Sequence, residues 1–347
     1  MTIDKKTAFV WTGVLLAIMA VVALGSGIFG SGSDTVVARK TDEITVAYFL
    51  EWPTPSQFAQ ARKIYEKELG VAINWRAFET GAAMSAAMAS GDVQLSFSQG
   101  IAPFVVAVSA GQDLQIVDVS ESYSESDNCV VRAGLEIDKT NARDLEGKQV
   151  AVPLGTVAHY GFLKQMAHFG VDTSAMTIVD MAPSDSAAAF ASGNLDMVCG
   201  WGGPLRRMKK HGNVLLTGAE KEAIGIRVFD VTTVPAAWAR ENARLLTKFL
   251  RVTADMNARF AAGERETMLP VIANAAGMDE NAAGATLDGF YFPTVEEQLG
   301  AKWLGGGVQT FLNEIASFFV EQGVIDSARA SYENAVDASY LTSASKM

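Results

Sequence analysis

The 347-residue sequence contains little cysteine, little histidine and little charge. Its two cysteines cannot build a zinc finger or a disulfide framework, and its three histidines show no spacing typical of a metal site. Charged residues make up 19% of the chain and hydrophobic residues 49%, which excludes a disordered protein. We therefore expect a folded protein without a metal or a cofactor, although a site made of carboxylates alone stays open.

Basic side chains are also scarce. The 28 Lys and Arg residues face 39 Asp and Glu residues, which gives a net charge of −11. Because binding to nucleic acid depends on basic side chains that neutralise phosphates, this balance argues against a nucleic-acid partner. The length exceeds that of one ordinary domain and suggests two, each able to bury a core.

The N-terminus has the pattern of an export signal. Lys5 and Lys6 precede an apolar run over residues 9–25, and a stretch rich in glycine and serine follows. The run is long for a signal peptide and short for a membrane span, so an uncleaved anchor is the alternative to a cleaved signal. We assign residues 1–42 to this leader and its tether, and we expect a periplasmic protein.

The two cysteines have two possible states. Cys129 and Cys199 both lie in strand-like runs, NCVV and DMVCGW. An exported protein reaches an oxidising compartment, where they could form a disulfide. The alternative is a pair of buried free thiols.

From residue 43 onward, short apolar strand patterns alternate with helical periodicity, and the chain becomes mainly helical after residue 236. The predicted strands are 44–50, 72–78, 93–98, 114–120, 128–133, 148–153, 177–181 and 195–201. The predicted helices are 56–69, 82–89, 103–110, 141–147, 159–169, 185–191, 239–262, 264–275, 279–288, 294–304 and 308–322. Such alternation predicts an α/β fold with parallel sheets that helices cover on both faces.

The strand and helix pattern runs through two blocks and predicts two α/β lobes. Residues 43–129 and 231–347 would form the first lobe, and residues 130–230 the second. The chain would cross between them at two hinges, near Asn128–Val131 and Phe229–Thr232. Because ligands of open α/β sheets bind outside the carboxyl ends of the strands, we expect a ligand cleft between the lobes.

Two segments carry a resemblance to a known family. INWRAFETGAAMSAAMASGDVQLS and LEGKQVAVPLGTVAHYGFLKQM resemble the taurine- and alkanesulfonate-binding proteins of ABC importers, in order through about residues 43–255. The resemblance implies a type II periplasmic-binding fold that closes about a hinge. It also implies a small sulfonate ligand, with taurine first, and delivery to a membrane permease and its ATPase. We further expect a monomer without catalytic activity.

Candidate contacts for an anionic group lie at turns from strand to helix. Thr156 follows the strand KQVAVP and opens a helix, where backbone N–H groups attract an anion, although it could only cap the helix. His159 and Tyr160 match the H-Y pair of the resembling family, and packing is the alternative role for His159. Ser98 and Gln99 follow the strand VQLSF, where they could bind ligand or only form the turn.

Candidate contacts for an ammonium group are carboxylates and aromatic rings. Asp230 lies at the second crossing, where the resembling taurine binders also carry an aspartate. Glu51 and Trp52 end the first strand, and Trp201 ends the last strand of the second block. Asn128 flanks the first crossing. Each could instead serve packing or hydrogen bonding inside the fold.

Other functions stay open at this point. The same transporter role could serve a quaternary-ammonium or sulfonium osmolyte, another amine or a nitrate-like anion. An enzyme of the thiamine-precursor type has the same fold in the wider group, but it needs clustered cysteine and histidine residues that this sequence lacks. A membrane-tethered sensor domain would require an uncleaved leader.

Overall fold

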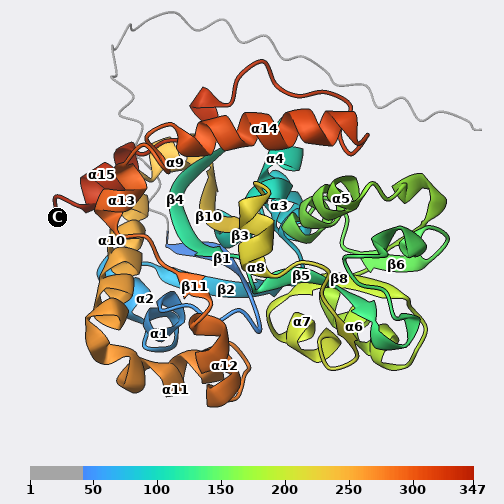
Figure 1. Cartoon of the computed structure of the whole chain (residues 1–347). Coiled ribbons are helices and arrows are strands. Elements are labelled where there is room, and N and C mark those ends of the chain that lie inside the picture. The colour runs from blue at the N-terminus through green and yellow to red at the C-terminus, as the bar shows by residue number, and fades with distance from the viewer. Residues whose placement is uncertain (1–41) are drawn as a thin grey trace, which may run out of the picture. The chain divides into compact units, whose positions relative to one another are not determined.

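The computed structural model describes residues 42–347 (Figure 1). The predicted leader and tether therefore lie outside the described residues, apart from Asp42. Within residues 42–347, no helix combines the length and the apolar character needed to cross a lipid bilayer.

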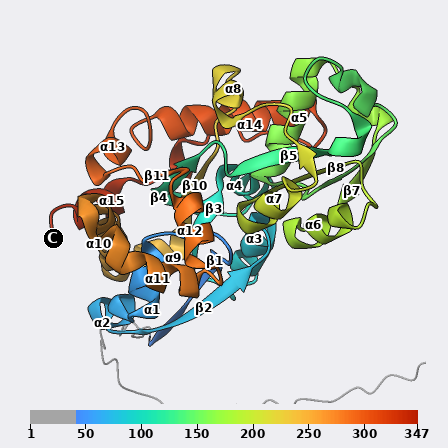
Figure 2. The ribbon, with the colours of Figure 1, turned by 60° about the horizontal axis from the view of Figure 1, so that its bottom comes forward.

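The described strands form two sheets (Figures 1 and 2). The six-stranded sheet has the order β11-β4-β10-β3-β1-β2 and contains β1 (Glu43–Phe49), β2 (Ala72–Phe78), β3 (Leu95–Gly100), β4 (Leu114–Tyr123), β10 (Phe229–Pro235) and β11 (Phe290–Tyr291). The five-stranded sheet has the order β7-β6-β8-β5-β9 and contains β5 (Asp127–Arg132), β6 (Gln149–Val152), β7 (Thr177–Asp180), β8 (Met197–Trp201) and β9 (Gly212–Asn213). The predicted α/β fold with two sheets is confirmed.

The sheets are mixed rather than parallel throughout. The pairs β1–β2, β1–β3, β6–β7 and β6–β8 are parallel, as the alternation with helices predicts. The strands next to the chain crossings, β4, β5 and β10, pair antiparallel with their neighbours. The expectation of purely parallel sheets is therefore wrong, because these strands carry the chain from one sheet to the other and back.

Helices surround both sheets. In the first half of the chain they are α1 (Ser56–Ala61), α2 (Ile64–Leu69), α3 (Gly81–Ala89), α4 (Ile101–Ser109), α5 (Val157–Phe169) and α6 (Pro183–Ala191). They continue with α7 (Gly202–Met208), α8 (Gly218–Ala223), α9 (Ala236–Glu241), α10 (Ala243–Arg259), α11 (Arg265–Ala275), α12 (Glu280–Leu287), α13 (Val295–Leu299), α14 (Gly307–Glu321) and α15 (Ser339–Ala344). Short 3₁₀ segments lie at Ala133–Leu135, Ala142–Leu145, Thr173–Ala175 and Glu333–Ala335, and a π segment at Phe260–Glu264 joins α10 to α11.

The two connections between the sheets touch each other. Residues 124–126 link β4 to β5, so the first crossing comes before the predicted hinge, which lies inside the hydrogen-bonded strand β5. Residues 214–228 link β9 to β10 and contain α8. The backbone N–H of Gly218 in α8 donates to Oε1 of Glu125 at 2.5 Å. This hydrogen bond therefore joins residues 124–126 to the second connection.

The two cysteines form a disulfide, which settles the alternative left open by the sequence. Cys129 of β5 and Cys199 of β8 face each other on adjacent antiparallel strands, with 4.0 Å between their Cα atoms. The bridge joins positions 70 residues apart in the chain and ties β5 to the middle of the five-stranded sheet.

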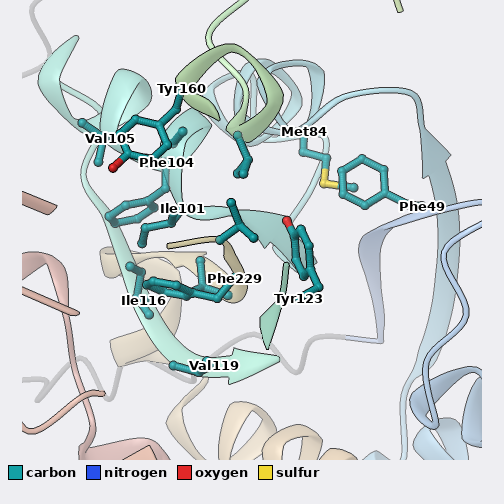
Figure 3. Close-up of a cluster of buried hydrophobic side chains, with 14 of the residues drawn as sticks. Phe49, Met84, Ile101, Phe104, Val105, Ile116, Val119, Tyr123, Tyr160 and Phe229 are labelled. Carbon is teal, nitrogen blue, oxygen red and sulfur yellow. The ribbon is translucent and has the colours of Figure 1, made fainter. Parts of the chain in front are cut away.

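A large apolar core lies against the six-stranded sheet. Figure 3 shows part of it, with Ile101 and Phe104 of α4, Ile116 of β4 and Phe229 of β10. Tyr160 of α5 belongs to the same core. Since α5 follows β6 of the five-stranded sheet, this core extends from one sheet to the other, while α6 and α7 pack on a separate smaller core that includes Phe190 and Leu205.

Candidate functional site

A small cavity of about 20 Å³ lies where the two sheets approach each other. Its wall on the side of the six-stranded sheet includes Trp52, Tyr123 and Asp230. Its wall on the other side includes Asp127 and Trp201. A cavity of this size has room for about one water molecule, so a larger ligand requires the two sides to move apart.

Three helices of nine or more residues begin at this cavity. Gly81 is the first residue of α3, while Gly100 and Thr156 directly precede α4 and α5. The α4 terminus has no side-chain cap. Because uncapped N–H groups and the helix dipole both favour negative charge, the cavity can attract an anionic group.

Gly100 allows the two sides to meet closely. A Cβ atom at this position would lie 2.6 Å from Cγ2 of Val157 and 3.5 Å from Oδ1 of Asp230. Real Cβ atoms do not approach a neighbour to 2.6 Å, so any larger residue would force α5 away from the start of α4.

Two buried carboxylates share one serine hydroxyl. Asp230 accepts from the Tyr123 hydroxyl at 2.5 Å through Oδ1 and from Ser98 Oγ at 2.9 Å through Oδ2. Glu121 accepts from Trp52 Nε1 at 2.6 Å and contacts the same Ser98 Oγ. A hydroxyl has only one proton to donate, so the second Ser98 contact requires a proton on a carboxyl group.

The protonation of this pair follows from its burial. Glu121 is fully buried, and desolvation raises its pKa to about 7. Burial, followed by the charge of Glu121, raises the pKa of Asp230 well above its usual value. The backbone of Ser98 has φ of +60°, a left-handed conformation that is uncommon outside glycine, and it brings the hydroxyl between both carboxyls.

Asp127 supplies a third carboxylate with an unused acceptor. It begins β5, is 2% exposed and lines the cavity, and its Oδ2 has no hydrogen-bond partner within residues 42–347. Burial raises its pKa to about 7, against the opposing charge of Lys221. The ammonium of Lys221, itself buried in α8, donates to the backbone carbonyl of Asp127. An unsatisfied buried acceptor is unfavourable, so this oxygen favours a ligand that brings a donor.

Aromatic rings complete the wall. Trp52 and Tyr123 pack edge to face with 4.7 Å between ring centroids, and Phe49 and Trp201 lie 6.1 Å apart. Such faces stabilise an organic cation by about 0.5–2 kcal/mol each. The cavity thus offers carboxylates and rings to a cation and helix N-termini to an anion.

Five of the ten site residues proposed from the sequence meet at this cavity. Trp52, Thr156, Trp201 and Asp230 line it. Ser98 lies directly behind the wall, in contact with Asp230. Thr156 also caps α5, since its Oγ1 accepts from the His159 N–H at 3.3 Å, so the capping role stated as an alternative is present.

Two of the remaining residues are bonded within the fold. Gln99 donates to the Gly81 carbonyl at 2.8 Å and accepts from Thr233 at 2.8 Å, so it positions the start of α3. Asn128 donates to the Leu216 carbonyl at 2.8 Å, which joins β5 to the second connection.

The other three lie outside the cavity wall. Glu51 forms a salt bridge with Arg207 of α7 at 2.7 Å, which joins the two sides at their rim. His159 accepts from the Gly155 N–H at 3.2 Å, and burial lowers the pKa of its imidazole to about 4, so it is neutral near pH 7. Tyr160 packs against the phenylalanines of α14.

Glu121 and Asp127 are functional candidates that the sequence analysis missed. Both lie in ESYSESDN, which reads as a polar loop, although β4 extends to Tyr123 and β5 begins at Asp127. The acidic residues of the segment were the available signal. Nothing in the pattern distinguishes these two from Glu125, whose side chain holds α8 instead.

Comparisons with known proteins agree with the sequence resemblance. Residues 55–282 match the family described as NMT1/THI5 like. The chain is 26% identical over 303 residues to the taurine-binding periplasmic protein of Escherichia coli (strain K12), a match that covers 86% of this chain and 92% of that protein.

Solved structures share the fold. The alkanesulfonate-binding protein SsuA from Xanthomonas axonopodis pv. citri, bound to MOPS, superposes with a TM-score of 0.70 at 18% identity, covering 85% of this chain and 98% of that one. The desulfurization enzyme DszB gives a TM-score of 0.61 at 14% identity, covering 88% and 99%. The fold alone therefore serves both binding proteins and an enzyme.

Proposed function

The chain belongs to the NMT1/THI5-like family, and on that premise we propose that it is the exported solute-binding component of an ABC importer for a small sulfonate, with taurine as the first choice. The protein acts by binding and release, without catalysis, and delivers its ligand to a membrane permease with an ATPase. It works in the periplasm as a monomer.

The strongest support is that donors for an anion and acceptors for a cation meet in one cavity. The starts of α3, α4 and α5 provide backbone N–H groups for a sulfonate. Asp127 provides a buried oxygen without a partner for an ammonium group. Taurine carries both groups on a short chain, so one molecule can satisfy both sides.

Movement of the two sides apart explains how a ligand larger than the cavity of about 20 Å³ can enter, and closure then brings both sides onto it. We treat each sheet with its helices as one lobe and the connections 124–126 and 214–228 as the hinge. Asp230 belongs to one lobe and Asp127 to the other, so a ligand that touches both stabilises the closed arrangement. The Glu51–Arg207 salt bridge at the rim would break on opening.

A quaternary-ammonium osmolyte is a second candidate, because four aromatic residues line the cavity. Such a cation has no N–H and leaves Oδ2 of Asp127 without a donor, whereas a primary ammonium satisfies it. The enzyme alternative has less support. Among the described residues that line the cavity there is no cysteine or histidine to act as nucleophile or base.

Calorimetric titration of the purified exported protein with taurine, glycine betaine and nitrate tests the proposal. We expect saturable binding of taurine in about the micromolar range and weaker binding of the other two. Absence of heat with taurine would exclude it as the ligand, and tight binding of glycine betaine would favour the osmolyte. N-terminal sequencing of the exported protein distinguishes a cleaved signal from an anchor.

A further inference from the structure

A second and larger cavity lies beside β4, and its lining residues differ from those of the central cavity. Its volume is about 330 Å³, within the range of small-molecule sites. The helices α10, α13 and α15 lie side by side next to β4 and form most of its wall (Figure 1). The segment 292–294 closes it on the remaining side. None of the residues that bind the proposed sulfonate lines this cavity.

Asp118 of β4 lies on the inner wall of this cavity. It is 3% exposed, and Thr232 Oγ1 donates to its Oδ2 at 3.1 Å. The amide of Gln298, in α13, also stabilises the charged form of the carboxyl. These neutral groups position the carboxylate but do not balance its charge.

No basic side chain is paired with Asp118 among the salt bridges of residues 42–347. The one guanidinium on the cavity wall, that of Arg251, binds Asp255 at 2.8 Å in a half-exposed pair at the mouth. The charge of Asp118 raises the pKa values of Tyr65 and Glu121. Neither of these groups supplies a positive charge. A buried carboxylate without a counter-charge favours a cation from outside.

The remaining wall is largely apolar. Ala254, Ala258 and Ala261 line it along the helical side, and Phe292 and Val295 line it opposite. We propose that this cavity is a second ligand site, which takes a small organic cation with an apolar body, such as an alkylammonium ion. The ammonium group binds Asp118, and the hydrocarbon part packs on the alanines and Phe292.

A metal ion fits this cavity less well. Calcium takes six to eight oxygen ligands, and magnesium takes six in a strict octahedron. In residues 42–347 no cluster of three or more His, Cys, Asp or Glu side chains could hold a metal. The buried carboxylate of Asp118, beside the alanines and Phe292, instead matches a monovalent cation that carries its own hydrophobic surface.

Titration of the full-length protein with cyclohexylammonium chloride tests the inference, with cyclohexanol as the neutral probe of the same shape. We expect saturable binding of the cation by calorimetry and by saturation-transfer NMR, and binding of the alcohol at least about tenfold weaker. The variant Asp118→Asn keeps the shape of the side chain and should weaken binding of the cation by about tenfold or more.

Three further variants assign the binding to this cavity. Asp127→Asn changes the central cavity, and binding of the probe should persist. Ala254→Phe fills the second cavity with Asp118 intact and should remove binding. Asp255→Asn, at the exposed mouth, should have little effect. Absence of saturable binding, equal binding of the alcohol, or binding that survives both Asp118→Asn and Ala254→Phe would each overturn the inference.

Discussion

Two cavities beside β4 place a buried carboxylate in opposite situations. Glu121 faces the central cavity and shares Ser98, Trp52 and the neighbouring Asp230 in one hydrogen-bond network. Asp118, three residues earlier, faces the second cavity, where a hydroxyl and an amide are its partners. A β-bulge in β4 lies between them, because Glu121 pairs with Asp230 and Asp118 pairs with Thr232, two residues further along β10. The two side chains therefore lie on the same face of the sheet but border different cavities.

The difference shows that burial alone does not determine what a carboxylate does in the protein. In the central cavity about 20 Å³ of space remains, and the charges there can be balanced by shared protons or by Lys221. In the second cavity about 330 Å³ remains, and the buried carboxylate of Asp118 has no basic partner among the salt bridges of residues 42–347. We therefore expect substitutions at the central cavity to alter binding of the sulfonate and substitutions at the second cavity to leave it unchanged.

The largest effect is expected for Asp127→Asn on taurine binding. Removing one partner of a buried charge pair weakens binding by about 3 kcal/mol, or roughly a hundredfold in Kd. Calorimetry of this variant beside Asp118→Asn measures it. An equal loss of taurine affinity in both variants would contradict the division between the two cavities.

Lys221→Met should reduce the free energy of unfolding by about 2 kcal/mol, because the Asp127 carbonyl loses its donor inside the protein. It should also weaken taurine binding near pH 7, since Asp127 loses the charge that favours its ionised form. Urea unfolding and calorimetry measure the two effects. The control is Lys209→Met, which removes an exposed lysine that donates to the Glu125 carbonyl at 3.2 Å. A variant at position 221 as stable as this control would refute the prediction.

The burial of Asp118 makes a contribution of its own to the pH dependence of stability. Burial raises the pKa of Asp118 from 3.8 to about 6 in the folded protein, so the folded state holds the proton more tightly than the unfolded state. This contribution is complete below about pH 4 and is lost as the pH rises through about 6, a change of about 3 kcal/mol.

Comparison of the wild type with Asp118→Asn isolates this contribution. His159 acts with the opposite sign in an overlapping range, since burial lowers its pKa to about 4 and its stabilising contribution returns as the pH rises. The stability lost by the wild type between about pH 4 and pH 7 should therefore exceed that lost by the variant. Parallel curves from urea unfolding would show that Asp118 does not titrate as described.

The smallest effect is expected for Thr232→Val. This change removes the hydroxyl that donates to Asp118 and should weaken binding of cyclohexylammonium by about 1 kcal/mol, because the ionised form loses a hydrogen bond. Thr233→Val, one residue later, removes a hydroxyl that donates to Gln99 instead. Calorimetry should show a loss for the first variant and none for the second.

Most of the strands and helices could be predicted from the sequence, because apolar strands and periodic helices follow one another with glycine at their ends. The ends of β4 and β5 could not. Their polar residues have the pattern of a loop, yet they form strands. Side chains around the cavity supply the hydrogen bonds that these polar groups need, as Trp52 does for Glu121. A pattern of hydrophobicity cannot reveal a strand whose inward face is polar.

The candidate site was predicted in part for a similar reason. Residues at strand ends, such as Trp52, Trp201 and Asp230, lie at the cavity because the topology brings these ends together. His159 and Tyr160 follow Thr156 by three and four positions on α5, which turns them toward Phe319 of α14. That rotation depends on where the helix begins and on what it packs against.

Ser98 shows that folding and binding place different demands on one residue. A left-handed backbone at a non-glycine residue costs about 1–2 kcal/mol, and this protein accepts that cost where one hydroxyl reaches two carboxyls. Ser98→Gly would relax the backbone and remove the hydroxyl. The serine thus combines a strained backbone with a hydroxyl that couples the protonation of Glu121 to that of Asp230.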